Sequence, residues 1–429
     1  MIETIEVPAL ARVEGEGGLY IQIKDGKAAE IRLDIYEPPR FFEGFLKGRF
    51  LQEVPDITAR ICGICPVAYQ MSSVQALEMA LGLQISDQAR QLRRLMYCGE
   101  YIESHALHIY LLQDPDLLGK ESALELAAVA PEVVKNALRM KKIGNDLLKA
   151  IGGRSVHPVN ACVGGFYRWA DVEPLKALLS DLEWGLEASL ETVRWSLTLP
   201  YPKLEMDYEF VALHRSDEYA IYDGEVWSSK RKPVPVDEFD KVYLEEHVRH
   251  SNALHSHTVD GNTYLVGPLA RLNLNHEQLS PMARKALKES KIKLPLRNPY
   301  KSLIARAIEL VDAYETAIQL VKGYKPVDKA HVPLVLKAGV GSGASEAPRG
   351  LLFHRYAVDA NGLVQRARIV PPTAQNLPRI EDDLRALVPQ LIKMPQAEAT
   401  LTAEHLVRAY DPCISCATHF LKLKIEEVE

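Results

Sequence analysis

The chain has 429 residues, 47% apolar and 25% charged, a composition typical of a soluble globular protein. Its 51 basic and 57 acidic residues give a net charge of −6, which argues against a nucleic acid or an anionic membrane as partner. The first residues, MIETIEVPAL, lack the pattern of a signal peptide, and no run approaches the roughly 18 apolar residues of a membrane span. These features predict a cytoplasmic protein. The six cysteines are too few for a disulfide scaffold and are available for metal or redox chemistry.

The N-terminal half is predicted to begin with strands and to continue with helices. Residues 4–35 alternate apolar and polar positions around Asp25-Gly26, which favours a hairpin in a small antiparallel sheet. Beyond them the apolar spacing becomes helical. The breaks at Ser86-Asp87, Asp114-Pro115 and Gly152-Gly153 then divide the pattern. Four helical segments are expected, near residues 55–82, 87–113, 118–150 and 171–198.

The C-terminal half is predicted to be mixed. Residues 200–275 are rich in Tyr, His, Pro and charge, and we expect irregular structure with short strands there. The remaining patterns predict helices at 281–290 and 299–321, a strand at 332–339, a hairpin around 359–362, and short helices at about 378–392 and 402–409. The fold class is therefore α+β and mostly α-helical.

Two C-x-x-C motifs stand near opposite ends of the chain, at Cys62 and Cys65 and at Cys413 and Cys416. The entropic cost of closing a loop grows only logarithmically with its length, so the separation does not prevent one shared four-thiolate site. Such a site requires residues 1–419 to form a single interlocked domain. The spacing alone leaves structural zinc and an iron–sulfur cluster open. The other two cysteines, Cys98 and Cys162, are expected to be small buried apolar residues.

The two motifs, RICGIC (60–65) and DPCISCATH (411–419), resemble the paired signatures of the large subunit of [NiFe] hydrogenases. Six further stretches are similar to family elements and occur in the same order: ARVEGEGG (11–18), RFFEGF (40–45), SHALHIYLLQDPDLL (104–118), GGRSVHPVNACVGG (152–165), YLVGPLARLN (264–273) and EAPRGLLFH (346–354). The resemblance implies the large-subunit fold, with a central helical bundle and small antiparallel sheets in the N-terminal and C-terminal parts. The amino-acid sequences of the two cysteine motifs are most similar to those of the cytoplasmic, NAD(P)-linked, sulfhydrogenase-like branch.

The resemblance also implies roles for the cysteines. Cys62 and Cys413 are expected to be terminal ligands of nickel, and Cys65 and Cys416 to bridge nickel and iron. Soft thiolates suit such metals. In the family the iron carries carbon monoxide and cyanide, which maturation enzymes supply.

Three further side chains are assigned to the centre by the same resemblance. Glu14 matches the glutamate that hydrogen-bonds the terminal cysteine of the second motif and relays protons, a role that suits a carboxylate. Arg349 matches the arginine above the open face of the metals, where its guanidinium can donate to cyanide. In the loop 370–376, Pro372 replaces a frequent hydroxyl donor, which leaves Thr373 as the nearest hydroxyl. Without the family context, Glu14 and Arg349 would be read as solvated surface charges.

Glu43 and His419 match ligands of a magnesium ion, or of another hard divalent cation, in the family. The histidines of the matched motifs, His105, His108 and His157, are interpreted as core or hydrogen-bonding residues more readily than as a route for protons or electrons. A second group has no compact ligand spacing and is interpreted as loop and surface histidines: His247, His250, His255 and His257.

The chain departs from the family pattern at several positions. Tyr69 stands where most relatives have a histidine after the first motif, and Ser104 stands where many have an aspartate near the arginine. Family precursors are commonly cut after the histidine of the last motif. Residues 420–429, FLKLKIEEVE, are therefore expected to be removed by a C-terminal endopeptidase after His419.

The predicted function is reversible heterolytic cleavage of H2. No further cysteine cluster and no G-x-G-x-x-G nucleotide motif are present, so electrons must leave through an iron–sulfur small subunit and, in the proposed branch, flavin and NAD(P)-binding subunits. One alternative is a different acceptor, such as a deazaflavin coenzyme. Two others are a quinone-site subunit of the complex I type, disfavoured because that class has lost the cysteines, and a non-catalytic protein with a four-cysteine zinc site.

Overall fold

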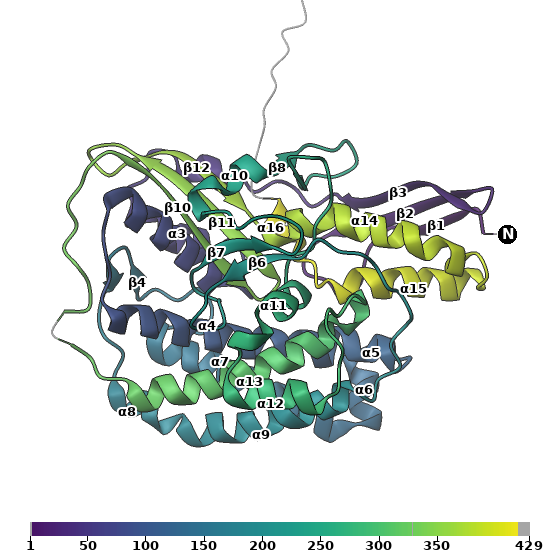
Figure 1. Cartoon of the computed structure of the whole chain (residues 1–429), viewed down its shortest axis with the longest axis horizontal. Coiled ribbons are helices and arrows are strands. Elements are labelled where there is room, and N and C mark those ends of the chain that lie inside the picture. The colour runs from purple at the N-terminus through teal and green to yellow at the C-terminus, as the bar shows by residue number, and fades with distance from the viewer. Residues whose placement is uncertain (1, 328, 419–429) are drawn as a thin grey trace, which may run out of the picture.

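The computed structural model describes residues 2–327 and 329–418. A layer of long helices lies beneath a layer that holds the sheets and the C-terminal helices (Figure 1). The long helices of the lower layer are α4 (Asp87–Leu107), α7 (Pro131–Gly152), α9 (Leu179–Ser196) and α13 (Ser302–Gly323). Shorter helices flank them: α5 (Asp114–Leu117), α6 (Ala123–Val129), α8 (Val172–Ala177) and α12 (Pro281–Glu289).

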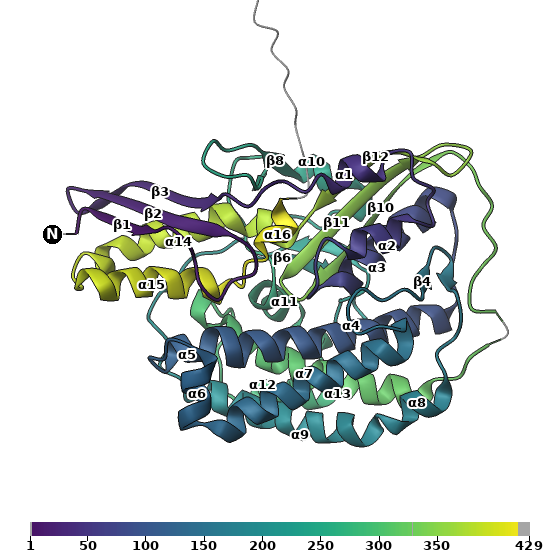
Figure 2. The ribbon, with the colours of Figure 1, turned by 180° about the vertical axis from the view of Figure 1, so that it is seen from behind.

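The upper layer contains two three-stranded antiparallel sheets. One is formed by β1 (Thr4–Val7), β2 (Gly17–Lys24) and β3 (Lys27–Ile35), and the other by β10 (Gly339–Ala347), β11 (Gly350–Val358) and β12 (Val364–Val370). The N-terminal sheet lies along α14 (Pro372–Leu391) and α15 (Gln396–Ala409), so segments far apart in the sequence pack together. Figure 2 shows the short helix α16 (Ile414–Ala417) between these two sheets.

The remaining elements are short, except for the helix α3. The small strand pairs are β4 (Ala161–Cys162) with β5 (Gly165–Phe166), β6 (Val211–His214) with β7 (Glu225–Ser228), and β8 (Tyr243–Glu246) with β9 (His255–Thr258). The other helices are α1 (Phe42–Leu46), α2 (Val54–Ala59), α3 (Pro66–Leu81), α10 (Phe239–Val242) and α11 (Pro268–Asn275). Among the described residues, no helix combines the length and the apolar character needed to traverse a bilayer.

The predicted mixed α+β fold with a helical bundle and two small antiparallel sheets is confirmed. The N-terminal hairpin turns at Asp25 and Gly26, whose φ angles of 52° and 74° are those that a tight hairpin turn needs. The predicted C-terminal hairpin is formed by β11 and β12.

The predicted helix 55–82 is wrong in one respect, because it is two helices. α2 ends at Ala59 and α3 begins at Pro66, and the segment between them carries the first cysteine motif. Proline at the start of α3 suits a helix terminus, since it has no N–H to leave unpaired. The interruption therefore places the two cysteines just before the N-terminal end of α3.

The predicted strand 332–339 is also wrong. The strand begins only at Gly339 and consists of the small residues GVGSGASEA. Gly341 and Gly343 lie against the backbone of α3, where a Cβ on either one would collide with the carbonyl oxygen of Ala76 or Ser72. The apolar pattern of 332–339 suggested a strand, but the close approach to α3 selects the glycine-rich segment instead.

Both C-terminal helices begin earlier than predicted. α14 starts at Pro372 rather than near 378, and α15 at Gln396 rather than 402. The prolines at 371, 372 and 378 suggested a loop, but proline is favourable in the first turn, and Pro378 is accommodated inside the helix. The early start of α14 places Thr373 in its first turn.

Candidate metal centre

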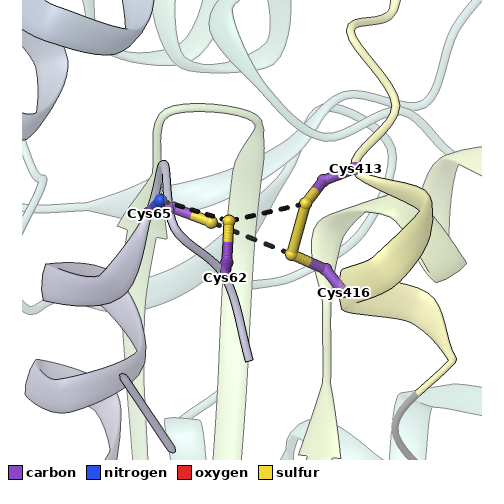
Figure 3. A group of neighbouring side chains, drawn as sticks. All are labelled: Cys62, Cys65, Cys413 and Cys416. Atoms are coloured by element: carbon purple, nitrogen blue, oxygen red, sulfur yellow. Dashed lines mark hydrogen bonds between the residues drawn. A yellow bond between two sulfur atoms is a disulfide. The ribbon is translucent and has the colours of Figure 1, made fainter. Parts of the chain in front are cut away.

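Both cysteine motifs lie at helix starts and meet in the interior. Cys65 directly precedes α3 and Cys413 directly precedes α16. The sulfurs of Cys62, Cys65, Cys413 and Cys416 all lie within 4.8 Å of one another, and all four residues are buried (Figure 3). The structure thus brings together the four residues that the sequence predicts as metal ligands.

The sulfurs are arranged in facing pairs. Cys62 Sγ lies 3.6 Å from Cys413 Sγ, and Cys65 Sγ lies 3.8 Å from Cys416 Sγ. A tetrahedral ion with metal–sulfur bonds of about 2.3 Å separates its sulfur ligands by about 3.8 Å. The pocket therefore has the dimensions of a thiolate metal site.

Cys413 and Cys416 are joined by a disulfide in this structure (Figure 3), whereas Cys62 and Cys65 are free. A thiolate, not a disulfide, ligates a metal ion. Cys413 and Cys416 therefore act as metal ligands in their reduced, thiolate form.

The electrostatic surroundings distinguish the two free thiols. Cys62 Sγ accepts hydrogen bonds from the backbone N–H groups of Ile64, at 3.3 Å, and Cys65, at 3.2 Å. Burial raises the pKa of Cys62, but hydrogen bonding by Cys65 and the charge of Arg349 outweigh it and lower the pKa. The hydrogen bond with Cys62, together with burial, raises the pKa of Cys65 well above its usual value. The pKa of Cys62 is therefore the lower of the two.

Glu14 lies directly against the second motif. Its backbone forms a bridge with Cys413, and its carbonyl oxygen accepts a hydrogen bond from Ile414 N at 2.9 Å. Its Oε2 accepts from Ser415 N at 3.1 Å and lies 3.0 Å from Cys413 Sγ. Glu14 is half-buried, whereas the cysteine is 1% exposed. The carboxylate therefore stands between a buried sulfur and the protein surface.

Arg349, in the turn between β10 and β11, is held by Asp411. Its Nε donates to the Asp411 carbonyl oxygen at 2.8 Å and its Nη2 to Asp411 Oδ1 at 3.0 Å. Burial alone would raise the pKa of the Asp411 carboxyl, but the Arg349 charge lowers it. The third nitrogen, Nη1, is buried and has no hydrogen-bond partner among the described residues. The positive charge of Arg349 also acts on Cys62 and Cys65.

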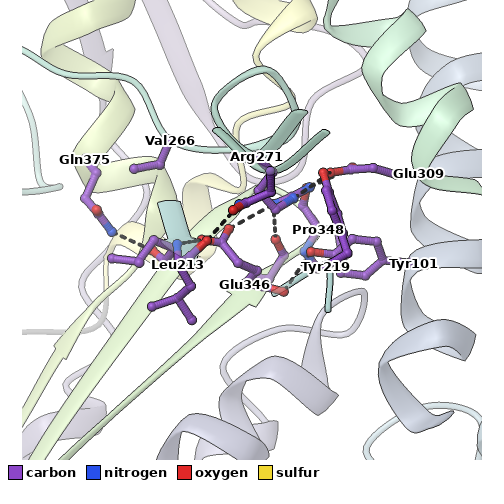
Figure 4. A network of polar contacts seen from close by, with 12 residues as sticks. Tyr101, Leu213, Tyr219, Val266, Arg271, Glu309, Glu346, Pro348 and Gln375 are labelled. Carbon is purple, nitrogen blue, oxygen red and sulfur yellow. Dashed lines mark hydrogen bonds and ion pairs between the residues drawn. The ribbon is translucent and has the colours of Figure 1, made fainter. Parts of the chain in front are cut away.

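A buried network fixes the turn before Arg349 (Figure 4). Arg271 donates to the carbonyl oxygens of Ala347 and Pro348, each at 2.9 Å. The same guanidinium makes two bonds to Glu309, at 2.7 and 2.8 Å, and one to Glu346 at 3.1 Å. Because each of these charges is paired, the network is stable in the interior and holds the backbone beside Arg349 in place.

The remaining predicted groups are placed as follows. Thr373 Oγ1 accepts a hydrogen bond from Cys413 N at 2.9 Å.

The two positions that depart from the family pattern are both buried. The Tyr69 side chain is fully buried, and its hydroxyl has no hydrogen-bond partner in the described chain. Burial raises the pKa of Tyr69, and the charges of Cys65 and Cys62 raise it further. Ser104 is buried with its hydroxyl likewise unpartnered among these residues. Asp411, not a residue at position 104, is the carboxylate that holds Arg349.

Glu43 Oε1 accepts a hydrogen bond from Ile369 N at 2.7 Å. Its predicted companion His419 and the predicted removable peptide 420–429 lie outside the described residues. The neighbouring Thr418 is fully buried, and its carbonyl oxygen accepts from Arg40 N at 2.7 Å.

The motif histidines make internal hydrogen bonds. His105 Nε2 lies 2.8 Å from Glu309 Oε2, His108 Nε2 lies 2.9 Å from the Arg408 carbonyl oxygen, and His157 Nδ1 lies 2.8 Å from the Ala59 carbonyl oxygen. Burial lowers the pKa of His105 to about 4 and that of His108 to about 3. The interpretation as core or hydrogen-bonding residues agrees with these contacts: His105 and His108 are buried, and His157 is partly buried.

The structure also tests the predictions for the other two cysteines and for the second group of histidines. Cys98 and Cys162 are buried, and burial raises their pKa to about 12 and about 11, so both are unreactive thiols. The surface interpretation of the second histidine group is wrong for His255, which is 2% exposed in β9.

Several supporting residues are absent from the sequence prediction. Asp411 stands inside the second motif, where its position next to Pro412 and Cys413 is the signal that could have identified it. The pairing of Arg271 with Glu309 and Glu346 carries no comparable signal, because these residues come from three separate elements. Arg40 donates to the carbonyl oxygens of Ile61, at 2.7 Å, and Ser415, and so connects both cysteine motifs.

Comparison with known proteins agrees with this geometry. A family model described as nickel-dependent hydrogenase matches residues 40–167 and 211–419. The chain is 34% identical to the sulfhydrogenase 1 subunit alpha of Pyrococcus furiosus, with 98% of each chain covered. It is 27% identical to the NAD-reducing hydrogenase HoxS subunit beta of Cupriavidus necator, over 98% of this chain and 96% of that one. Its structure matches a chain of a crystal structure of an NAD+-reducing [NiFe]-hydrogenase in the H2-reduced state, with a TM-score of 0.88 and 27% identity, over 97% of this chain and 100% of that one.

Proposed function

Because the chain belongs to the nickel-dependent hydrogenase family, we propose that Cys62, Cys65, Cys413 and Cys416 hold its nickel–iron centre and that H2 is split and formed there. The observation that carries this proposal is the buried cluster of four sulfurs with a carboxylate 3.0 Å from one of them. The donor set fits the metals, since soft thiolates bind nickel and iron well. When bound, the centre supplies the Lewis acid and the redox capacity for heterolytic cleavage of H2.

The facing pairs support a division of roles among the sulfurs. Cys62 and Cys413 form one pair and Cys65 and Cys416 the other, which suits two terminal nickel ligands and two ligands shared with iron. The low pKa of Cys62 relative to Cys65 makes it the first of the free pair to become a thiolate.

Glu14 is the proton relay of this proposal. Its Oε2 takes up a proton at Cys413 Sγ and passes it outward, because the carboxylate is within transfer distance of the sulfur and Glu14 is only half-buried. The bond from Ser415 N keeps the carboxylate aimed at the sulfur.

Arg349 and Thr373 provide donors for small anionic ligands such as the cyanide on iron. The buried Arg349 Nη1 has no partner in the described chain, and a buried charged donor without one is costly. Thr373 Oγ1 accepts from Cys413 N, which leaves its own O–H able to donate. Both groups suit a site whose iron carries carbon monoxide and cyanide.

Electron transfer requires partner subunits. After the four ligands, the chain has only Cys98 and Cys162, fewer cysteines than an iron–sulfur cluster needs. We therefore place an iron–sulfur small subunit next to this chain, with flavin and NAD(P)-binding subunits and further iron–sulfur subunits beyond it. The likeness to a sulfhydrogenase alpha subunit and to an NAD-reducing hydrogenase subunit supports a cytoplasmic, NAD(P)-linked enzyme.

Two maturation features complete the proposal. Glu43 and His419 hold a magnesium ion, or a similar cation, near the C-terminus, and maturation factors insert the metals before an endopeptidase removes residues 420–429. The buried Thr418 and its bond to Arg40 support tight packing of the chain up to the predicted cleavage site.

Metal analysis of the native complex tests the central proposal. We expect about one nickel and one iron at this chain's site, with H2-dependent reduction of NAD(P)+. Cys65→Ser should abolish the activity and the nickel content, whereas the matched Cys98→Ser variant, which alters a buried cysteine outside the cluster, should retain both. One zinc without nickel would show that the site is structural. Activity with another acceptor but not with NAD(P)+ would refute only the assignment of the acceptor.

A further inference from the structure

A second group of metal-ligating side chains lies away from the four cysteines. It consists of His250, His255 and Glu381, which offer two imidazole nitrogens and a carboxylate oxygen, all within 4.8 Å of one another. His250 precedes β9, His255 is the first residue of β9, and Glu381 lies on α14. His250 Nε2 lies 2.9 Å from Glu381 Oε1, and the two imidazole ring centroids are 5.4 Å apart.

His255, the buried residue of this group, has a ring nitrogen that is free to bind a ligand. His255 is 2% exposed, and its Nε2 has no hydrogen-bond partner among the residues that the structure describes. A buried polar atom without a partner costs free energy, so an unsatisfied imidazole nitrogen beside a histidine and a glutamate indicates a missing ligand.

The glutamate is held in position by a neighbouring strand. Glu381 Oε1 accepts a hydrogen bond from Leu33 N of β3 at 2.9 Å. Such a bond orients a ligating carboxylate, as second-layer contacts do in established metal sites. The two histidines thus come from β9 and the segment before it, the carboxylate comes from α14, and β3 supports the carboxylate through Leu33 N.

We propose that His250, His255 and Glu381 form a second metal site, which binds a divalent transition-metal ion, zinc in particular. Two imidazoles and one carboxylate suit zinc, whereas magnesium and calcium prefer oxygen ligands. Three protein ligands leave one position for water. The side chains of His250 and Glu381 are 22% and 14% exposed, so that position is accessible to solvent.

The proposed ion connects elements that carry the nickel–iron centre. α14 begins one residue before Thr373, whose hydroxyl contacts the backbone of Cys413, and it lies along β3 in the N-terminal sheet (Figures 1 and 2). A metal bound between α14, β9 and their neighbour β3 stabilises this arrangement without sharing a ligand with the four cysteines. Its role is structural.

Zinc titration of the purified native complex, after removal of loosely bound ions with a chelator, tests the proposal. We expect the wild type to bind one zinc per chain in addition to nickel and iron, and cobalt bound in its place to give the intense visible absorption of low-coordinate Co2+. His255→Gln and Glu381→Gln should each weaken binding by at least about tenfold and remove that absorption. The control is His257→Gln, which changes a histidine two residues along β9 that contacts Glu246 instead.

Two controls separate loss of the site from loss of the fold. Glu381→Gln retains an oxygen that can accept from Leu33 N, so this variant keeps the connection to β3. Its nickel content should equal that of the wild type, and zinc should raise the melting temperature of the wild type and of His257→Gln but not of Glu381→Gln. Absence of zinc uptake by the wild type, or equal uptake by His255→Gln, would overturn the proposal. Equal weakening by His257→Gln would assign the zinc to nonspecific surface binding and overturn it as well.

Discussion

At the scale of single residues, the contact between Cys413 and Glu14 supports the proposed direction of proton transfer. The sulfur is buried and Glu14 is half-buried, so the carboxylate is an adjacent acceptor for a proton released at the sulfur. The backbone of Glu14 is fixed by its bond to Ile414, and its side chain by Ser415 N. The position of the carboxylate therefore does not depend on the metals.

Replacing this carboxylate with an amide should stop proton transfer without disturbing the site. In Glu14→Gln the amide oxygen can still accept from Ser415 N, but the side chain no longer takes up a proton. We expect H/D exchange with solvent during H2 turnover to fall by about 10² to 10⁴-fold, with nickel and iron contents unchanged. Mass spectrometry of the evolved HD and D2 measures this exchange. The matched Glu16→Gln variant alters an exposed neighbour and should exchange normally; normal exchange in Glu14→Gln would refute the relay.

Substitution of Arg349 tests whether activity depends on the geometry of the guanidinium or only on its charge. Lysine keeps the charge but cannot donate to both the carbonyl and the carboxylate of Asp411 while also presenting a third nitrogen. We expect Arg349→Lys to lower kcat by roughly tenfold to hundredfold while nickel content stays constant. Arg355→Lys, on β11 and paired with Asp240, is the control and should keep its kcat. An unchanged kcat in Arg349→Lys would show that charge alone suffices.

The sequence identified the residues that touch the site better than those that support it. The cysteines, Glu14, Arg349 and Thr373 stand in motifs with a fixed order, and the structure brings the cysteines, Glu14 and Thr373 together. Arg271 and Arg40 act through long-range hydrogen bonds to backbone carbonyls, which depend on how distant segments pack. The spacing of residues in the sequence does not predict such bonds, because every residue has a backbone carbonyl oxygen that could be the acceptor.

At the scale of elements, the packing of β10 on α3 positions both Cys65 and Arg349. Cys65 precedes the first turn of α3, and Arg349 follows the end of β10. The two elements approach closely because Gly341 and Gly343 leave room for the α3 backbone. This arrangement also explains why the strand was predicted in the wrong segment. An apolar pattern indicates side chains that become buried, whereas the strand that packs on α3 must have almost no side chain at the contact.

Adding a side chain at this contact should separate the two elements. A valine at position 341 would meet the backbone of Ala76 and Ala80, which cannot move without shifting α3. We expect Gly341→Val to lower the free energy of unfolding by about 1 to 3 kcal/mol and to reduce nickel occupancy. Denaturant unfolding and metal analysis measure the two effects. Gly323→Ala, where an added Cβ meets no atom within 4 Å, is the control; equal stability of both variants would contradict the close-packing account.

The buried histidine that follows α4 makes stability depend on pH. His108 has a folded pKa of about 3, because burial disfavours its charged form, against an ordinary value of 6.5. The unfolded chain therefore binds a proton that the folded chain does not, and the stability contribution decreases as pH falls from about 6.5 toward 3. We expect His108→Gln to reduce the slope of stability against pH in this window by up to about 1.4 kcal/mol per pH unit. Urea unfolding at pH 7, 6 and 5 measures the slope, and an unchanged slope would refute the assignment.

At the scale of the whole molecule, contacts from the N-terminal region hold the C-terminal motif in place. Arg40 bonds the backbone of both motifs, and its own N–H bonds the Thr418 carbonyl oxygen. Arg408 of α15 bonds Asp116, at 2.7 and 3.1 Å, and the Ala11 carbonyl oxygen at 3.1 Å. These contacts lie on both sides of the second cysteine motif in the sequence. The pairing of the two cysteine motifs does not predict which arginines make these contacts.

These contacts lead to a prediction about maturation. Thr418, the last residue that the structure describes at this end, is buried, and the predicted cut after His419 follows one residue later. If removal of residues 420–429 follows metal insertion, intact-mass measurement should show that nickel-loaded, active chains end at His419 and that metal-free chains have all 429 residues. Cys65→Ser, which lacks one metal ligand, should accumulate uncut, whereas Cys98→Ser should be cut like the wild type. Active enzyme with the full 429-residue mass would show that closure of the C-terminal motif around the metals needs no cleavage.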